Sequence, residues 1–328
     1  MTRKKWCLIG AAILGLSGIS ASINPIAQTY VAPMVKEQVN NAINGSVNYD
    51  SLRINWNCDV VLTDVTIKDR DDHLVGTARE VAVGVKLSAL PSIITSNTSG
   101  ATAISSVIVE APDLHIWQLA DGSWSVEKLV KPSDPNKSGS FDGSITIHDG
   151  RVAVRTKDGL KRNVESLDGT MALNMGGMSK GAFTADVDGS SVVLNGTIDM
   201  DHVSNFDLFV QADEIDTAGF MSFVPLRQDL SVTGGKLQDL HLNIKSEDGN
   251  YIMSGNVGFK GLTGTYKRGN TIYNITDGTG RIMLNHDQIV ISRSSWRVND
   301  QVAKVNGLVT LGKEEEYLNL NVVADKVA

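Results

Sequence analysis

The sequence predicts a mainly β protein, with an N-terminal transmembrane and amphipathic helical region and then a long curved, mostly antiparallel β-sheet that forms an apolar groove. Three observations predict it. An uncharged apolar run follows three basic residues at the N-terminus, apolar and polar residues alternate along most of the chain after residue 55, and Asp-Gly pairs recur between the alternating runs. Successive side chains of a strand point to opposite faces, so the alternation indicates one dry face and one wet face.

The N-terminal segment, residues 1–24, is predicted to be a retained membrane anchor. Its apolar run from Trp6 to Ile23 carries no charge and has about the 18 residues that a spanning helix needs. The basic residues precede it, so the N-terminus is expected in the cytoplasm and the bulk of the chain across the membrane. A cleaved signal peptide ending near Ser20-Ala21-Ser22 is the alternative. The expected anchor residues are Arg3, Lys4, Lys5, Trp6, Leu8, Ile9, Ile13, Leu14, Leu16 and Ile19.

Residues 25–45 are predicted to form an amphipathic helix, because Val31, Val35, Val39 and Ala42 recur at three- and four-residue steps. Residues 46–131 are expected to form a first β unit. The polar stretch 132–140 has the composition of a linker, and residues 141–328 are expected to form a repetitive antiparallel groove.

The dry face of the strands is the predicted binding surface. Its expected lining is aliphatic with occasional aromatic residues: Val81, Val83, Val85, Leu87, Val107, Val109, Leu114, Ile116, Ile145, Ile147, Val152, Val154, Leu173, Phe183, Val187, Leu208, Val210, Leu240, Leu242, Ile244, Val257, Phe259, Ile282, Leu284, Val309, Leu311, Leu318 and Leu320. Two arrangements produce such a pattern. A β-sandwich buries the dry faces of two sheets against each other, whereas a trough leaves one dry face open to acyl chains. Periodicity alone does not decide between them.

The Asp-Gly pairs favour type I′ hairpin turns, in which both central residues have positive φ. Their aspartates are Asp121, Asp142, Asp149, Asp158, Asp168, Asp188, Asp248 and Asp277. The acidic group Asp69, Asp71 and Asp72 is expected to be the solvated tip of another hairpin.

Catalysis, metals and nucleic acid are not expected. Ser125 and Lys128 have the spacing of a serine nucleophile and its lysine, but the SDN and KTG partners of that chemistry are missing, so we interpret the segment as a strand end after Trp124. The six histidines are widely separated, which argues against a metal site, and no cofactor motif is present. The net charge of −7, without a basic stripe after residue 5, disfavours nucleic acid as a partner.

Residues 1–130 resemble the AsmA/TamB group of bacterial envelope proteins. After the basic single-span N-terminus, Val60–Asp69 follows an apolar-x-L-x-D-V-x-apolar pattern. Ala111-Pro112-Asp113-Leu114 then leads into Asp121-Gly122-Ser123-Trp124 and Leu129. The remainder of the chain is similar only in its repetitive strand style.

The resemblance implies an inner-membrane, single-pass protein whose bulk lies in the periplasm. It implies a β-groove that carries phospholipid between the inner and outer membranes, with phospholipid acyl chains and the inner membrane as partners. The alternative is a scaffold for translocation and assembly of outer-membrane proteins such as autotransporters, with outer-membrane barrel proteins as partners. TamB-type members are far longer, and this chain stops in mid-pattern at Ala328, so we expect either a fragment or a short relative.

Overall fold

The computed structural model describes residues 43–55, 59–85, 104–129, 142–157, 159, 161–174, 177–200, 202, 204–217, 229–247, 250–311 and 316–324. The predicted anchor, Leu87 and the predicted linker lie outside these residues, as does the expected amphipathic helix up to residue 42. Within the described ranges, none of the helical structure has the length and apolar character needed to cross a bilayer. The chain divides into two compact units, Met1–Lys180 and Gly181–Ala328.

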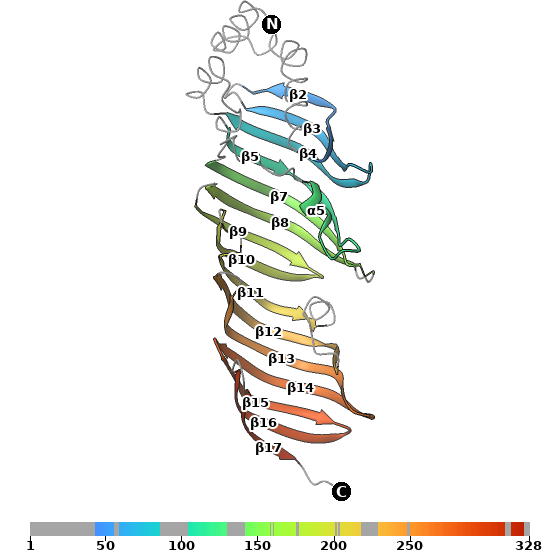
Figure 1. Ribbon diagram of the computed structural model, residues 1–328, viewed down its shortest axis with the longest axis vertical. Helices are drawn as coiled ribbons and strands as arrows, with labels where there is room; N and C mark the ends of the chain where they lie inside the picture. Colours follow the sequence, from blue (N-terminus) through green and yellow to red (C-terminus); the bar gives the residue numbers. More distant parts are fainter. Residues whose placement is uncertain are drawn as a thin grey trace, which may run out of the picture. The chain divides into compact units, whose positions relative to one another are not determined.

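The first unit is a mixed sheet of short and long strands (Figure 1). Its strands are β1 (Gly45–Asn48), β2 (Ser51–Ile54), β3 (Val60–Asp69), β4 (Leu74–Val85), β5 (Ile104–Glu110), β6 (Asp113–Trp117), β7 (Asp142–Arg155) and β8 (Lys161–Asn174). β1 and β2 pair with opposite halves of β3. β5 and β6 likewise pair with β4 on one side, and both run parallel to β7 on the other.

The break between β5 and β6 has a local cause. Ala111 has a positive φ of 46°, and Pro112, which has no N–H, cannot donate a hydrogen bond to a neighbouring strand. One continuous strand is therefore interrupted, and its two halves share β7 as a neighbour.

The second unit is a regular antiparallel succession of long strands. They are β10 (Ser190–Asp199), β11 (Phe206–Asp216), β12 (Leu230–Glu247), β13 (Asn250–Arg268), β14 (Thr271–Asn285), β15 (Gln288–Val298), β16 (Gln301–Leu311) and β17 (Glu316–Ala324). From β10 onward each strand pairs with the next. β9 (Met178–Val187) contains the division between the units and pairs with β10. The mainly β, mostly antiparallel prediction is confirmed.

Half of the eight Asp-Gly pairs lie within strands instead of between them, which corrects the sequence-based expectation for those four; Asp142-Gly143 begins β7. Asp188-Gly189 lies at the turn between β9 and β10, as expected. Asp149-Gly150, Asp168-Gly169 and Asp277-Gly278 lie inside β7, β8 and β14. Asp149 and Asp277 have φ near 50°, and the strand register shifts beside both. Asp tolerates the positive φ that occurs both in a hairpin turn and in a β-bulge. A bulge bends a strand without ending it.

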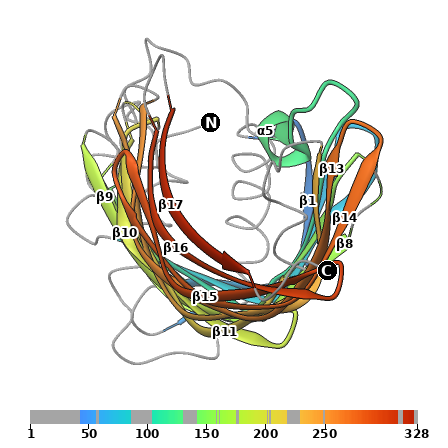
Figure 2. The ribbon, with the colours of Figure 1, turned by 90° about the horizontal axis from the view of Figure 1, so that it is seen from below.

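In each unit the strands form a single layer whose strands are visibly bent (Figure 2). Among the described residues of each unit, the strands pair edge to edge into one sheet, and α5 (Ser125–Leu129) contacts β6. Within the described part of each unit, therefore, no second sheet covers either face. The sandwich alternative does not apply to those residues.

Candidate functional site: an apolar face built from cross-strand ladders

In the second unit the register brings apolar residues from successive strands into rows that run across the strands. One row passes through Val210, Leu242, Gly255, Leu284, Ile289, Val309 and Leu318. A parallel row passes through Val257, Ile282, Ile291, Gly307 and Leu320. Directly opposed residues lie on the same side of a sheet, so these rows define one face, which we call the ladder face.

The first unit has a ladder face of the same kind. One row contains Ile54, Val60, Val83, Val107, Ile145 and Met171. Another contains Ile67, Gly76, Leu114, Val152 and Val164. The parallel pairing of β5 and β6 with β7 keeps these rows continuous, since it brings Val107 opposite Ile145 and Leu114 opposite Val152.

Most ladder side chains are only partly buried. Leu242, Leu284, Ile289 and Val309 all have intermediate exposure. A sealed core instead leaves its aliphatic residues fully buried. The ladder face of the second unit therefore keeps a large apolar surface in contact with solvent.

Glycines interrupt the ladders where the backbones approach closely. A Cβ on Gly255 would lie 2.0 Å from the carbonyl oxygen of His241, and a Cβ on Gly307 would lie 2.1 Å from that of Asn319. No side chain fits at either position without a backbone shift, so each glycine leaves a low point between large aliphatic neighbours.

An aromatic pair lies on the ladder face beside two further glycines. The rings of Phe259 on β13 and Trp296 on β15 are 4.9 Å apart with an interplanar angle of 30°. On β14 between them, a Cβ on Gly278 would meet the Trp296 ring at 2.5 Å, and a Cβ on Gly280 would meet the Phe259 ring at 2.7 Å. The rings therefore lie over the glycine positions of β14 and cover its backbone.

The opposite face of the second unit carries polar rows and ion pairs. Asn243 donates to Asp207, and Lys245 pairs with Glu247. Arg281 on β14 reaches Asp239 on β12 at 2.7 Å and crosses β13 where Gly258 provides no side chain. Met283, Val290 and Leu308 form one apolar row within this face.

The structure brings most of the predicted lining residues onto the two ladder faces. In the first unit, Val81, Val109 and Ile147 form one row, Ile116 pairs with Val154, and Leu173 pairs with Gly143. In the second, Leu208 pairs with Ile244, and Leu240 pairs with Ala212. Phe183 and Val187 lie on β9, which pairs with β10. The side chains of Val85 and Leu311 are outside the described part of the chain.

Sequence reasoning missed several members of the ladder faces. Trp296 lies in the polar stretch Ser292–Arg297, where a bulge at Arg293, with φ of 50°, shifts the alternation by one residue. Ile54 was missed because β2 is only four residues long, too short for an alternation to stand out. Val60 was missed because it begins β3 in the unbroken apolar run Val60-Val61-Leu62, which shows no alternation. The sequence signal that could have identified Trp296 is its position, which is one residue out of phase with the apolar alternation before it. A bulge explains this shift.

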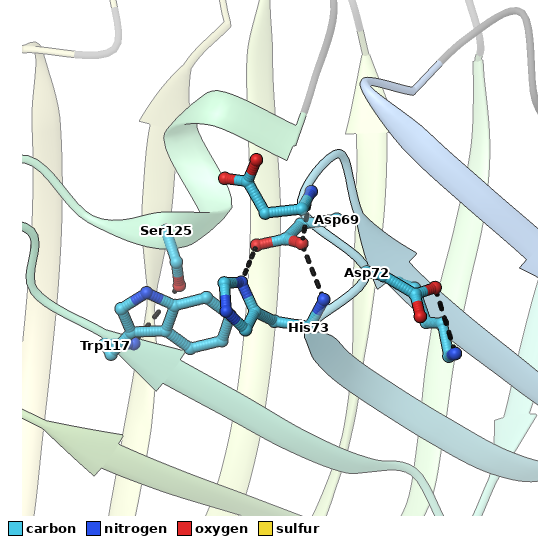
Figure 3. Close-up of polar contacts among 7 residues, drawn as sticks. Asp69, Asp72, His73, Trp117 and Ser125 are labelled. Atoms are coloured by element: carbon cyan, nitrogen blue, oxygen red, sulfur yellow. Dashed lines mark hydrogen bonds and ion pairs between the residues drawn. The ribbon is translucent and has the colours of Figure 1, made fainter.

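Ser125 at the start of α5 lies near Trp117, close to Asp69 and His73 of the turn between β3 and β4 (Figure 3). Ser125 begins α5, so the interpretation of this segment as a strand end is wrong. Its hydroxyl accepts a hydrogen bond from the backbone N–H of Trp117 at 3.1 Å. The Lys128 ammonium group forms an ion pair with Asp121 at 2.8 Å. The serine therefore stabilises the junction of β6 and α5, and the lysine ammonium group stabilises the loop that contains Asp121.

The acidic hairpin tip is confirmed between β3 and β4. The Asp69 carboxylate accepts the backbone N–H groups of Asp71 and His73 and contacts His73 Nδ1 at 3.1 Å. The His73 ring packs edge-on against Trp117, with 6.0 Å between ring centroids. The carboxylates of Asp69 and Asp71 and the ring of His73 place possible metal-ligand atoms within 4.8 Å of one another. The Asp69 carboxylate and the His73 ring contact each other within this turn.

The loop before α5 carries a clear electrostatic effect. Hydrogen bonds from the Lys128 ammonium group and from the hydroxyl and backbone N–H of Ser123 hold the pKa of the Asp121 carboxyl well below its usual range. The Asp121-Gly122-Ser123-Trp124 segment is thus a self-contained loop closed by its own aspartate.

Comparison with known proteins adds no assignment: no family model matches the chain, and no curated protein matches it.

Proposed function

We propose that this protein binds phospholipid acyl chains along its ladder faces and provides a hydrophobic path for phospholipid between the inner and outer bacterial membranes. The supporting observation is a set of aliphatic cross-strand rows, only partly buried, on sheets that no second layer covers in their described parts. The resemblance of residues 1–130 to the AsmA/TamB group supports the same function.

The bend of the strands supports a groove on the ladder side. The buried hydrophobic residues described in the second unit are Ala212, Ile215, Leu240 and Phe259. All four belong to the ladder face, since Ala212 pairs with Leu240 and Ile215 follows through Leu237 to Phe259. Side chains converge on the concave side of a bent sheet and become more buried there. We therefore assign the ladder face to the concave side.

The energetics suit an acyl chain. Each methylene removed from water contributes about 0.8 kcal/mol, so one long chain represents on the order of 10 kcal/mol. Rows of Val, Leu and Ile supply contact without requiring hydrogen bonds from the guest. Because the rows run across the strands, a chain lying along one row contacts several strands in succession and can slide from one to the next.

A matched pair of substitutions on one strand tests this function. Leu284 lies in a ladder row, and its neighbour Met283 is 47% exposed on the opposite face. Leu284→Glu should remove most co-purifying phospholipid, because it places a charge among the aliphatic side chains. Met283→Glu should leave the lipid content unchanged. Lipid mass spectrometry after gentle detergent extraction, with circular dichroism as the folding control, is the measurement. A lipid-free wild-type chain, or equal loss in both variants, contradicts the function.

A further inference from the structure

The first unit has a hollow on the face opposite its ladder rows. Its volume is about 390 Å³, which is in the range of small-ligand pockets. The register gives its side, because Leu114 and Val152 belong to a ladder row and the residues that follow them, His115 and Ala153, therefore point the other way. The hollow is thus separate from the apolar rows of the same strands.

Two rows of directly opposed residues form this hollow across β6, β7 and β8. They are His115–Ala153–Asn163 and Trp117–Arg155–Lys161. The short side chain of Ala153 leaves space between its two longer neighbours. Leu74 of β4, which is 41% exposed, adds an apolar lining residue. The lining therefore combines positive charge, hydrogen-bond donors and apolar surface.

The two cations of the hollow are directly opposed, since Arg155 on β7 pairs with Lys161 on β8. Like charges in this position destabilise strand pairing, and a bound anion would remove that cost. Both side chains are exposed, and within the described ranges neither forms an ion pair. By contrast, Arg79 and Arg281 each pair with a carboxylate of another strand. A local rule broken without compensation is expected where a site binds a ligand.

The donors of the hollow favour a phosphate group as that ligand. A guanidinium group binds two phosphate oxygens at once, and an ammonium group adds a compact positive charge. The Asn163 amide and the His115 imidazole supply further N–H groups, although His115 Nε2 also lies 3.8 Å from Asp113. No aspartate or glutamate is among the described residues that line the hollow. Donors from three strands suit a tetrahedral anion better than a planar carboxylate.

We propose that this hollow, the Arg155 pocket, binds a phosphate group, either in the headgroup of a phospholipid or free in solution. The two sources present the same oxygens to Arg155 and Lys161. The apolar surface of Leu74 and Trp117 favours a phosphate that belongs to a partly apolar molecule. Because the pocket faces away from the ladder rows, binding here does not require that acyl chains occupy those rows.

The test is isothermal titration calorimetry on the full chain in an uncharged mild detergent, with dihexanoyl phosphatidylglycerol and inorganic phosphate as probes. Arg155→Gln/Lys161→Gln should weaken binding at least about tenfold, because two charge-assisted contacts are lost. Arg155→Lys, which keeps the charge but not the planar fork, should bind more tightly than Arg155→Gln. Lys260→Gln/Lys304→Gln removes two exposed charges from the second unit and should leave binding unchanged.

Leu74→Ser distinguishes the two sources of phosphate. If it weakens binding of the lipid and not of inorganic phosphate, the ligand is a phospholipid headgroup. If the wild-type chain binds both probes equally and Leu74→Ser changes neither, the ligand is free phosphate. Leu284→Glu on the ladder face of the second unit should leave phosphate binding intact, so the pocket and the proposed acyl-chain path can fail separately.

Three outcomes overturn the proposal. One is a wild-type chain that binds neither probe at concentrations up to about 10 mM. Another is equal loss of binding in the double-glutamine variant and in its control from the second unit, because the effect then reflects net charge alone. The third is loss of phosphate binding in Leu284→Glu, which would place the anion elsewhere. Circular dichroism confirms that each variant is folded.

Discussion

The two units use the same ladder architecture and differ in how deeply they bury it. In the first unit Val47, Leu52, Leu62, Val65 and Ala78 form a buried cluster beneath short, irregular strands. In the second unit the buried cluster is limited to Ala212, Ile215 and Leu240, and most of the remaining rows are partly exposed. The first unit thus has a cluster of fully buried side chains on β1 to β4, whereas most ladder side chains described in the second unit are partly exposed.

The difference follows from strand regularity. β1 and β2 run in the same direction along β3, and β5 and β6 run in the same direction between β4 and β7. The first unit therefore contains long strands that are broken into two short ones. The second unit repeats hairpins of similar length, which extend the face without covering it. A large exposed apolar patch of this kind promotes association unless a ligand or a partner covers it.

The largest expected effect compares truncation of one leucine from each unit. Leu52 is 1% exposed, whereas Leu284 is half-buried in an open row. Leu52→Ala should destabilise the protein by about 3 kcal/mol, through lost burial and a cavity. Leu284→Ala should cost about 1 kcal/mol, because little cavity forms on an open face. Urea unfolding followed by circular dichroism measures both, and equal costs would mean that the second unit is as closed as the first.

A smaller effect is expected from the glycines within the ladders. A Cβ on Gly255 meets backbone at 2.0 Å, whereas one on Gly76 meets the end of the Leu114 side chain at 2.6 Å. Gly255→Ala should cost about 2 kcal/mol, because a strand must move. Gly76→Ala should cost under about 1 kcal/mol, because the leucine can rotate. Thermal unfolding of the two variants tests this order, and a reversed order would contradict it.

The smallest effect concerns the loop that precedes α5 in the first unit. The folded-state pKa of Asp121 is depressed, so its contribution to stability is fully present above the unfolded pKa of about 4 and is lost as the pH falls toward the folded pKa. Asp121→Asn should lower the unfolding midpoint slightly and equally at pH 7 and pH 5. Below pH 4 the difference from wild type should shrink. A difference that persists unchanged to strongly acidic pH would contradict the assignment.

The strands and their polarity were readable from the sequence because alternation is a local property. Val107 and Val109, or Leu284 and Ile282, share a face in any strand. The bulges were not readable, because Asp-Gly favours positive φ in a hairpin turn and in a mid-strand bulge alike. Trp296 was missed because a bulge at Arg293, which no Asp-Gly pair marks, shifts the alternation by one residue. The helix at Ser125 was missed because five residues carry too little periodicity to identify it.

By itself the sequence determined that this is a β protein with one apolar and one polar side to its strands, since side-chain direction along a strand depends only on residue parity. Only the tertiary structure decided which residues become neighbours in a row, because that depends on the register between strands and on every bulge that shifts it. It also decided that the described apolar faces are not sealed by a second sheet, a property of packing between elements that no local pattern contains.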